Sequence, residues 1–165
     1  GISAKNLQVV MGGPGAHTAL GQLKKCRDAG VNFINISPIK DDVPENLDAE
    51  WMPIRPSTDT ALILALCHTL FVENLHDENF LAKYCVGFER VKPYLLGSTD
   101  GQVKDAKWAS TITNIPATKI VSLARTMATN RTFVTMSWSL QRAEHGEQPY
   151  WASILLMSID RKSVV

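Results

Sequence analysis

The chain contains 165 residues, about one domain's length, and 45% of them are hydrophobic, enough to build a buried core. Its 17 lysines and arginines nearly balance 16 aspartates and glutamates, so the net charge of +1 gives no broad basic surface and nucleic acid is not the expected partner. Three cysteines without a Cys-x-x-Cys pair form neither a disulfide framework nor a zinc site. The longest apolar run, residues 61–72, is too short for membrane insertion.

The first third of the chain predicts a helix followed by extended segments. Residues 17–26 carry apolar side chains at helical spacing and are followed by Gly30, a conventional helix stop. Residues 31–36 are rich in β-branched and aromatic side chains and close on Ser37-Pro38, which predicts a buried strand. Residues 51–56 contain two prolines and are predicted to be extended, because each proline disfavours helix at the residue before it.

The remaining two thirds predict mainly helices. Thr58 or Asp59 is placed to cap the first of them, and Asp77 is placed to cap the second. Another helix has Pro116 in its first turn and stops at Asn130. The two capped helices are predicted over residues 60–73 and 78–84, and further helices over residues 87–96, 104–113 and 149–159. Residues 132–136 read as a second strand.

This alternation of helices and strands predicts an α/β fold with a mostly parallel sheet flanked by helices. We expect a single domain over residues 1–165, with an atypical tail over 158–165 where the helical pattern is lost. The first residues show neither an initiator methionine nor a signal-peptide pattern, so we expect the chain to be part of a longer protein.

Polar residues follow the extended segments at the points where they end. In open parallel sheets ligands bind at the carboxyl ends of strands, beside helix N-termini. The hydroxyls and backbone N–H groups in these loops suit phosphate or ribose, Asp59 suits the N–H donors of a guanine edge, and Arg142 suits phosphate charge. The segments are Ser37-Pro38, Arg55-Pro56-Ser57-Thr58-Asp59 and Trp138-Ser139-Leu140-Gln141-Arg142.

Each of these residues also has a purely structural interpretation. Asp59 fits a helix cap, Ser37-Pro38 a strand terminator, Arg142 a surface charge and Trp138 a core aromatic. Taken singly, the structural interpretation is favoured for every one of them. The nucleotide hypothesis depends on their occurring together at one edge of the sheet.

Three other motifs are better explained by structure than by chemistry. The run Gly12-Gly13-Pro14-Gly15 matches no phosphate-binding pattern and predicts a turn. Cys67 and His68 are adjacent on a helix, so they do not face each other and are expected in the core. Glu144-His145-Gly146-Glu147 is a weak metal or acid–base set and is expected to lead into a helix.

The segment from Trp138 to Gln148, with Pro149-Tyr150-Trp151 after it, closely resembles the molybdopterin oxidoreductases of the dimethyl sulfoxide, trimethylamine N-oxide and biotin sulfoxide reductase group. The resemblance continues through residues 56–61, 74–89 and 93–97, and it covers nearly the whole chain.

The resemblance implies that two molybdopterin guanine dinucleotides hold one molybdenum in the parent enzyme, and that this chain is the Rossmann-like domain carrying much of one of them. It implies a molybdenum-ligating serine upstream of Gly1, and no catalytic or metal-ligating residue in this chain. The remaining domains of the parent are the implied partners. The residues implied to line the cofactor are Lys5, Asn6, Ile36, Ser37, Pro38, Ser57, Thr58, Asp59, Trp138, Ser139 and Arg142.

Three departures from the family pattern stand out. The family commonly has Ile-Asp-Pro where this chain has Ile36-Ser37-Pro38, so a carboxylate is replaced by a hydroxyl. The run at residues 12–15 is unusual, and residues 160–162 replace the start of a Gly-rich stretch.

The resemblance implies a parent enzyme that reduces an S-oxide or N-oxide, such as trimethylamine N-oxide, dimethyl sulfoxide or biotin sulfoxide, by oxygen-atom transfer. The 165-residue chain alone is expected to be inactive. The alternative is a non-catalytic nucleotide-binding module that keeps the sheet and its loops.

Overall fold

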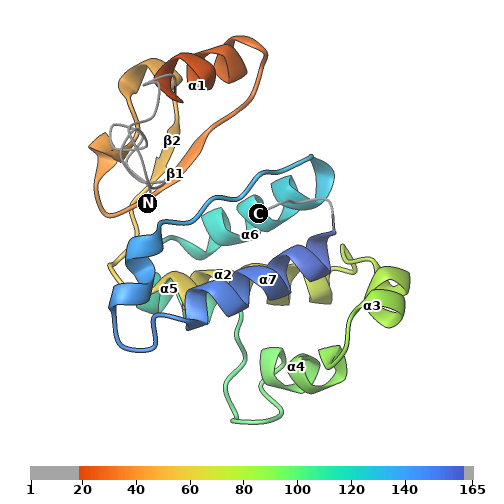
Figure 1. The fold of residues 1–165 in the computed structure, drawn as a ribbon. Helices are drawn as coiled ribbons and strands as arrows, with labels where there is room; N and C mark the ends of the chain where they lie inside the picture. Colours follow the sequence, from red (N-terminus) through yellow and green to blue (C-terminus); the bar gives the residue numbers. More distant parts are fainter. Residues whose placement is uncertain (1–18, 162–165) are drawn as a thin grey trace.

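A computed structural model describes residues 19–161 (Figure 1). The fold is mixed α/β and mostly helical, with one short two-stranded sheet. The elements in chain order are α1 (Ala19–Asp28), β1 (Ile34–Ile36), η1 (Lys40–Asp42), η2 (Glu45–Leu47), β2 (Glu50–Met52), α2 (Asp59–Val72), α3 (Glu78–Tyr84), α4 (Phe88–Leu95), α5 (Ala106–Thr113), α6 (Ala117–Thr129), η3 (Trp138–Arg142) and α7 (Gln148–Asp160).

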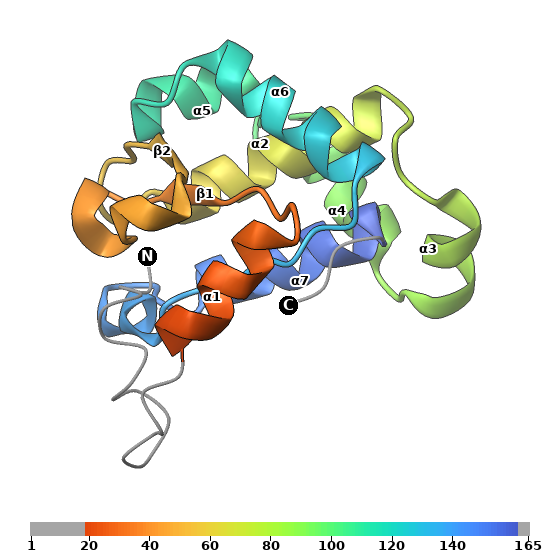
Figure 2. The same ribbon diagram turned by 90° about the horizontal axis from the view of Figure 1, so that it is seen from above.

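Helix α2 lies at the centre of the core. Nine of its fourteen residues are buried, and it packs against α5, α6 and α7 (Figures 1 and 2). A helix that is apolar around its whole circumference must be covered on several sides. The other three helices supply that cover with buried side chains such as Ala109, Ile120 and Leu156.

The two strands pair in parallel, with Ile34 opposite Glu50 and Ile36 opposite Met52. The strand predicted over residues 31–36 is therefore confirmed in its second half, and β2 overlaps the predicted extended segment at Trp51 and Met52. Because the strands are parallel, their carboxyl ends lie at the same edge of the sheet. In Figure 1 this sheet and α1 form a layer above the helical layer that contains α2.

The expectation of a strand over residues 132–136 is wrong. This segment is extended, but it contains only an isolated bridge at Phe133. Val134 and Met136 pack against the core while Phe133 is 72% exposed. The alternation of apolar and polar residues is typical of an extended segment with one buried face. A β-strand also needs a neighbouring backbone with which to form hydrogen bonds. The described part of the sheet is accordingly smaller than the sequence predicts.

Helix boundaries agree with the local signals, with one exception in capping. Asp77 caps α3 as predicted, because its Oδ1 accepts a hydrogen bond of 2.9 Å from the Phe80 N–H. The predicted side-chain cap of α2 is not formed: Thr58 occupies the N-cap position, but its hydroxyl donates to the Arg55 carbonyl at 2.6 Å. Helix α7 continues to Asp160, past the expected start of the atypical tail.

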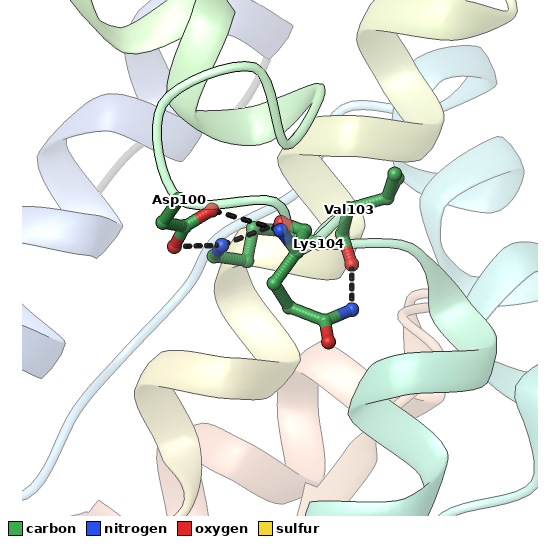
Figure 3. A network of polar contacts seen from close by, with 4 residues as sticks. Asp100, Val103 and Lys104 are labelled. Atoms are coloured by element: carbon green, nitrogen blue, oxygen red, sulfur yellow. Dashed lines mark hydrogen bonds and ion pairs between the residues drawn. The ribbon is translucent and has the colours of Figure 1, made fainter.

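The connection between α4 and α5 closes around a buried lysine (Figure 3). The Lys104 ammonium group donates to Asp100 Oδ2 and to the Gln102 carbonyl, each at 2.6 Å, and lies 4.3 Å from the Tyr94 ring centroid. Only 2% of the Lys104 side chain is exposed. Its charge is therefore compensated by a carboxylate, a carbonyl and an aromatic face.

Helix α1 lies at the outer side of the molecule. It has no buried residue and packs mainly against η2, where the Arg27 guanidinium donates to the Asn46 carbonyl. Among the helices within residues 19–161, none combines the length and apolar character that crossing a membrane requires.

Candidate functional site

The candidate site lies where β1 and β2 end and α2 begins. The chain leaves β2 at Met52, passes through an extended stretch and enters α2 at Asp59. Figures 1 and 2 both place η3 on the same side of the molecule as the start of α2. The fold thus brings the three predicted segments to one side of the molecule, although they lie far apart in the sequence.

Ser37 directly follows β1 and is fully buried. Its hydroxyl donates a hydrogen bond to the Asp42 carboxylate and accepts one from the Ile39 N–H at 3.1 Å. Its carbonyl accepts a bond of 2.9 Å from the Trp51 indole N–H on β2. The Ser37 side chain is therefore committed to holding its own loop, while Ile36 is half-buried and Pro38 is exposed.

The segment that leads into α2 contains the predicted site residues Ser57, Thr58 and Asp59. Ser57 is exposed and has a φ of 61°, in the left-handed region that non-glycine residues seldom adopt. Thr58 is partly buried, with its hydroxyl turned to the Arg55 carbonyl. Burial raises the pKa of Asp59 above the usual range of an aspartate, because its charged form has lost part of its hydration.

Tyr150 of α7 anchors the start of the η3 segment. The Tyr150 hydroxyl donates to the Ser137 carbonyl at 2.7 Å, and the Ser137 and Ser139 hydroxyl oxygens are 2.6 Å apart. Trp138 is 60% exposed, so its interpretation as a core aromatic is wrong. Arg142 is exposed, and no ion pair joins it to another residue in the described range 19–161.

The turn after η3 depends on close backbone contact. Gly146 is buried, and a Cβ at this position would clash with the backbone of Gln141. His145 before it adopts a φ of 56°. Glu147 is exposed and immediately precedes α7, so the predicted role of this motif as a helix entry is confirmed.

The other sequence predictions have mixed outcomes. Cys67 is fully buried in the core, as expected, and burial strongly raises the pKa of its thiol. His68 is only partly buried, and loss of hydration lowers its pKa. Lys5 and Asn6, together with the turn predicted at residues 12–15, lie outside the described residues.

Two surface hollows lie away from the candidate site. One of about 460 Å³ lies between α2, α5 and α6 and is lined by residues that include His68, Asp105 and Arg125. Another of about 380 Å³ is lined by residues that include Arg27 and Asp48, beside the segment that leads into β1. Neither contains a residue predicted to bind the cofactor.

Two residues that position this edge were not predicted from the sequence. Asp42 is the acceptor for Ser37, and Tyr150 fixes η3. The sequence signal for Asp42 was the carboxylate pair five and six residues past the strand, in Ser37-Pro38-Ile39-Lys40-Asp41-Asp42.

Parallel strands that end in polar loops beside a helix N-terminus define an α/β fold with a candidate ligand-binding edge. The chain belongs to the molybdopterin oxidoreductase family, whose family model matches residues 16–161. The family name points to molybdopterin as the cofactor of its members.

Curated relatives agree with this assignment. The chain is 46% identical to the biotin sulfoxide reductase of Cereibacter sphaeroides, over 96% of this chain and 21% of that protein. It is 49% identical to trimethylamine-N-oxide reductase 1 of Escherichia coli strain K12, over 84% of this chain and 17% of that protein. It is 39% identical to the dimethyl sulfoxide/trimethylamine N-oxide reductase of Rhodobacter capsulatus, over 87% of this chain and 17% of that protein.

A solved structure supports the fold. Acetylene hydratase from Pelobacter acetylenicus superposes with a TM-score of 0.73 over 87% of this chain and 19% of that chain, at 24% identity. The chain thus spans about a fifth of the length of the proteins it matches.

Proposed function

We propose that this chain is the cofactor-binding part of a molybdenum oxidoreductase that reduces an S-oxide or N-oxide. The observation that carries the proposal is the family match over residues 16–161, together with relatives named for biotin sulfoxide, trimethylamine N-oxide and dimethyl sulfoxide. Because the chain spans about a fifth of those relatives, its partners in the proposal are the other domains of the parent enzyme.

The proposal extends to the form of the cofactor and to the fold. The bound group is molybdopterin guanine dinucleotide, and β1 and β2 belong to a Rossmann-like, dinucleotide-binding sheet in a single domain over residues 1–165. The parallel register of the two strands and the superposition on acetylene hydratase support this assignment. Both are consistent with a ligand at the carboxyl edge of the sheet.

The side chains at this edge fit the guanosine and phosphate half of such a cofactor. Arg142 offers an exposed guanidinium without an ion pair among the described residues, which suits a phosphate. The exposed Trp138 ring offers a face on which a base can stack. The Asp59 carboxylate, when ionised, accepts the two N–H donors of a guanine edge.

The chain's own contribution is to bind and orient the dinucleotide. Molybdopterin carries a molybdenum that supplies oxygen-atom transfer chemistry, and such cofactors leave binding, orientation and local electrostatics to the protein. The side chains at the edge would fix the guanosine end, and thereby the direction in which the remainder of the cofactor extends. The substrate, an S-oxide or N-oxide, would be bound by the assembled parent enzyme.

A thermal melt of the chain with and without GDP tests this function. A ligand that binds only the folded state raises the melting temperature, so GDP is expected to stabilise the wild-type chain. The shift is expected to be lost in Asp59→Ala and retained in Asp41→Ala, which removes an exposed carboxylate outside the candidate set. A cooperative melt that GDP leaves unchanged would contradict guanosine binding by this chain.

A further inference from the structure

We infer that the outer face of helix α7 is the surface on which another domain of the parent enzyme docks through apolar contacts. The outer face consists of Trp151, Ile154, Leu155 and Ser158, which follow one another at the i, i+3, i+4 and i+7 spacing of a single helix face. The inference rests on the function proposed above in one respect, that the chain is part of a larger enzyme.

Helix α7 carries apolar side chains on two sides. Its inner side packs against α2, and Ala152, Leu156 and Ile159 are buried in the core. The two exposed residues of the helix are Trp151, at 62%, and Ile154, at 63%. Because residues three apart are neighbours on a helix surface, these two large side chains form one apolar patch.

The outer face of α7 offers neither a charge nor an unengaged hydroxyl donor. The Ser158 hydroxyl donates to the Ile154 carbonyl at 2.8 Å, within the helix itself. Asp160 is the one charged residue of α7, and it is buried. Burial of a polar group against such a face would be unfavourable, since the face could not pair with it. The surface that docks here is therefore itself apolar and uncharged.

Helix α6 provides a comparison within the same molecule. Like α7 it has 13 residues and packs against α2, which lies between the two helices in Figure 2. All its exposed side chains are polar or charged, as is typical of a helix that faces water. They are Thr118, Lys119, Ser122, Arg125, Thr126 and Thr129. The contrast indicates that α6 faces solvent in the parent, whereas the outer face of α7 is covered.

The remainder of the parent enzyme is the occupant that the comparisons support. The matched segment makes up 21% of the biotin sulfoxide reductase and 17% of trimethylamine-N-oxide reductase 1, so most of a parent of that size lies outside this chain. Domains of one polypeptide meet at an effective concentration of about a millimolar, whereas a second copy must associate from dilute solution. The covalently linked domain is therefore the favoured partner.

Hydroxyl-radical footprinting of Trp151, in the 165-residue chain and in the full-length parent enzyme, tests the inference. The radical oxidises side chains that solvent reaches, so Trp151 is expected to react in the chain. In the parent it is expected to react about fivefold or more slowly, because the core of an interface excludes water. Ile154→Lys places a charge in that apolar contact and is expected to restore most of the reactivity in the parent.

The matched control is Ser122→Lys, which adds the same charge at an exposed position of α6 and is expected to leave Trp151 protected in the parent. Melts of both variants in the 165-residue chain verify that they fold. Each lysine is exposed there and is expected to change the melting temperature by less than about 2 °C.

Equal reactivity of Trp151 in the chain and in the parent would overturn the inference. Protection of Trp151 in the chain itself, growing with protein concentration and lost in Ile154→Lys, would also overturn it, because the face would then bind a second copy. Reduction of an S-oxide or N-oxide by the wild-type parent is measured separately. An active parent with an unprotected Trp151 would leave only the proposed function standing, and an inactive parent with a protected Trp151 would leave only the inference.

Discussion

At the scale of single residues, Asp59 combines a place in the proposed site with a cost to folding. Its carboxyl group lies at the first residue of α2, where a helix N-terminus normally favours negative charge. Loss of hydration nevertheless outweighs the local hydrogen bonding, and the pKa is raised. A carboxylate whose ionised form destabilises the fold is expected at a binding site, where a bound ligand supplies the hydrogen-bond donors that the fold lacks.

This raised pKa gives a pH-dependent prediction. The folded chain binds the Asp59 proton more tightly than the unfolded chain, so stability is greatest below the unfolded pKa and falls as pH rises through the folded pKa. Asp59→Asn is therefore expected to melt at a higher temperature than wild type at about pH 7, with the gap closing below about pH 4. Calorimetric melts across this range measure the effect.

The control for the pH series is Asp41→Asn, because Asp41 is an exposed carboxyl in the short helix η1, outside the hydrophobic core. It is expected to follow the wild-type curve. An Asp59→Asn chain that melts below wild type at neutral pH would show that the helix N-terminus, and not desolvation, dominates at this carboxylate.

Lys104 is a buried charged residue of the helical layer, and its replacement is expected to destabilise the fold. Replacement by Met keeps the buried stem but leaves the Gln102 carbonyl and the aromatic faces of Tyr94 and Trp108 without their cation. Loss of such a buried charged donor is worth about 2 kcal/mol, or about 4–8 °C in melting temperature. Lys107→Met, on the exposed side of α5, is expected to change it by less than about 2 °C.

Differential scanning calorimetry of the two lysine variants provides the comparison. Equal melting temperatures for Lys104→Met and Lys107→Met would mean that the bonds drawn in Figure 3 add nothing to stability. The comparison is independent of any ligand, because neither lysine belongs to the candidate site.

At the scale of elements, η3 is the part of the site most sensitive to backbone packing. Gly146 lies against the Gln141 backbone, so Gly146→Ala must displace the turn that closes η3. We expect the melting temperature to fall by several degrees and the GDP-induced shift to be reduced, while the helical content remains, because the core helices do not depend on this turn.

The control is Gly21→Ala in α1, where a Cβ meets no atom within 4 Å. Alanine in a helix is favoured over glycine by about 0.5–1 kcal/mol, so this variant is expected to be as stable as wild type or slightly more stable. Circular dichroism and GDP melts compare the two variants. A Gly146→Ala chain that responds to GDP like wild type would remove η3 from the site.

At the scale of the whole molecule, the sequence predicted the helices well and the sheet poorly. Helix ends are marked by local signals, such as Asp77 before α3, and the described helices begin and end close to the predicted residues. Strand formation depends on a distant partner, so residues 132–136 had the composition of a strand without forming one.

The same distinction applies to the candidate site. The sequence predicted that residues 37–38, 55–59 and 138–142 would share one strand-end edge. The first two segments follow β1 and β2, whereas residues 138–142 follow no strand within the described residues. The sequence did not predict that Ser37 would be buried, since this depends on Asp42 folding back from η1 and on Trp51 from the neighbouring strand. Nor did it predict that Trp138 would be exposed, which depends on how Tyr150 holds η3.

The central claim is that this edge, and not another surface of the chain, binds the guanosine end of the cofactor. The most direct measurement is a titration of the isotope-labelled 165-residue chain with GDP, followed through its backbone amide NMR signals. The account predicts that the signals that move belong to residues 37–42, 57–61 and 138–142. Signals that move instead around His68, or that do not move at all, would contradict it.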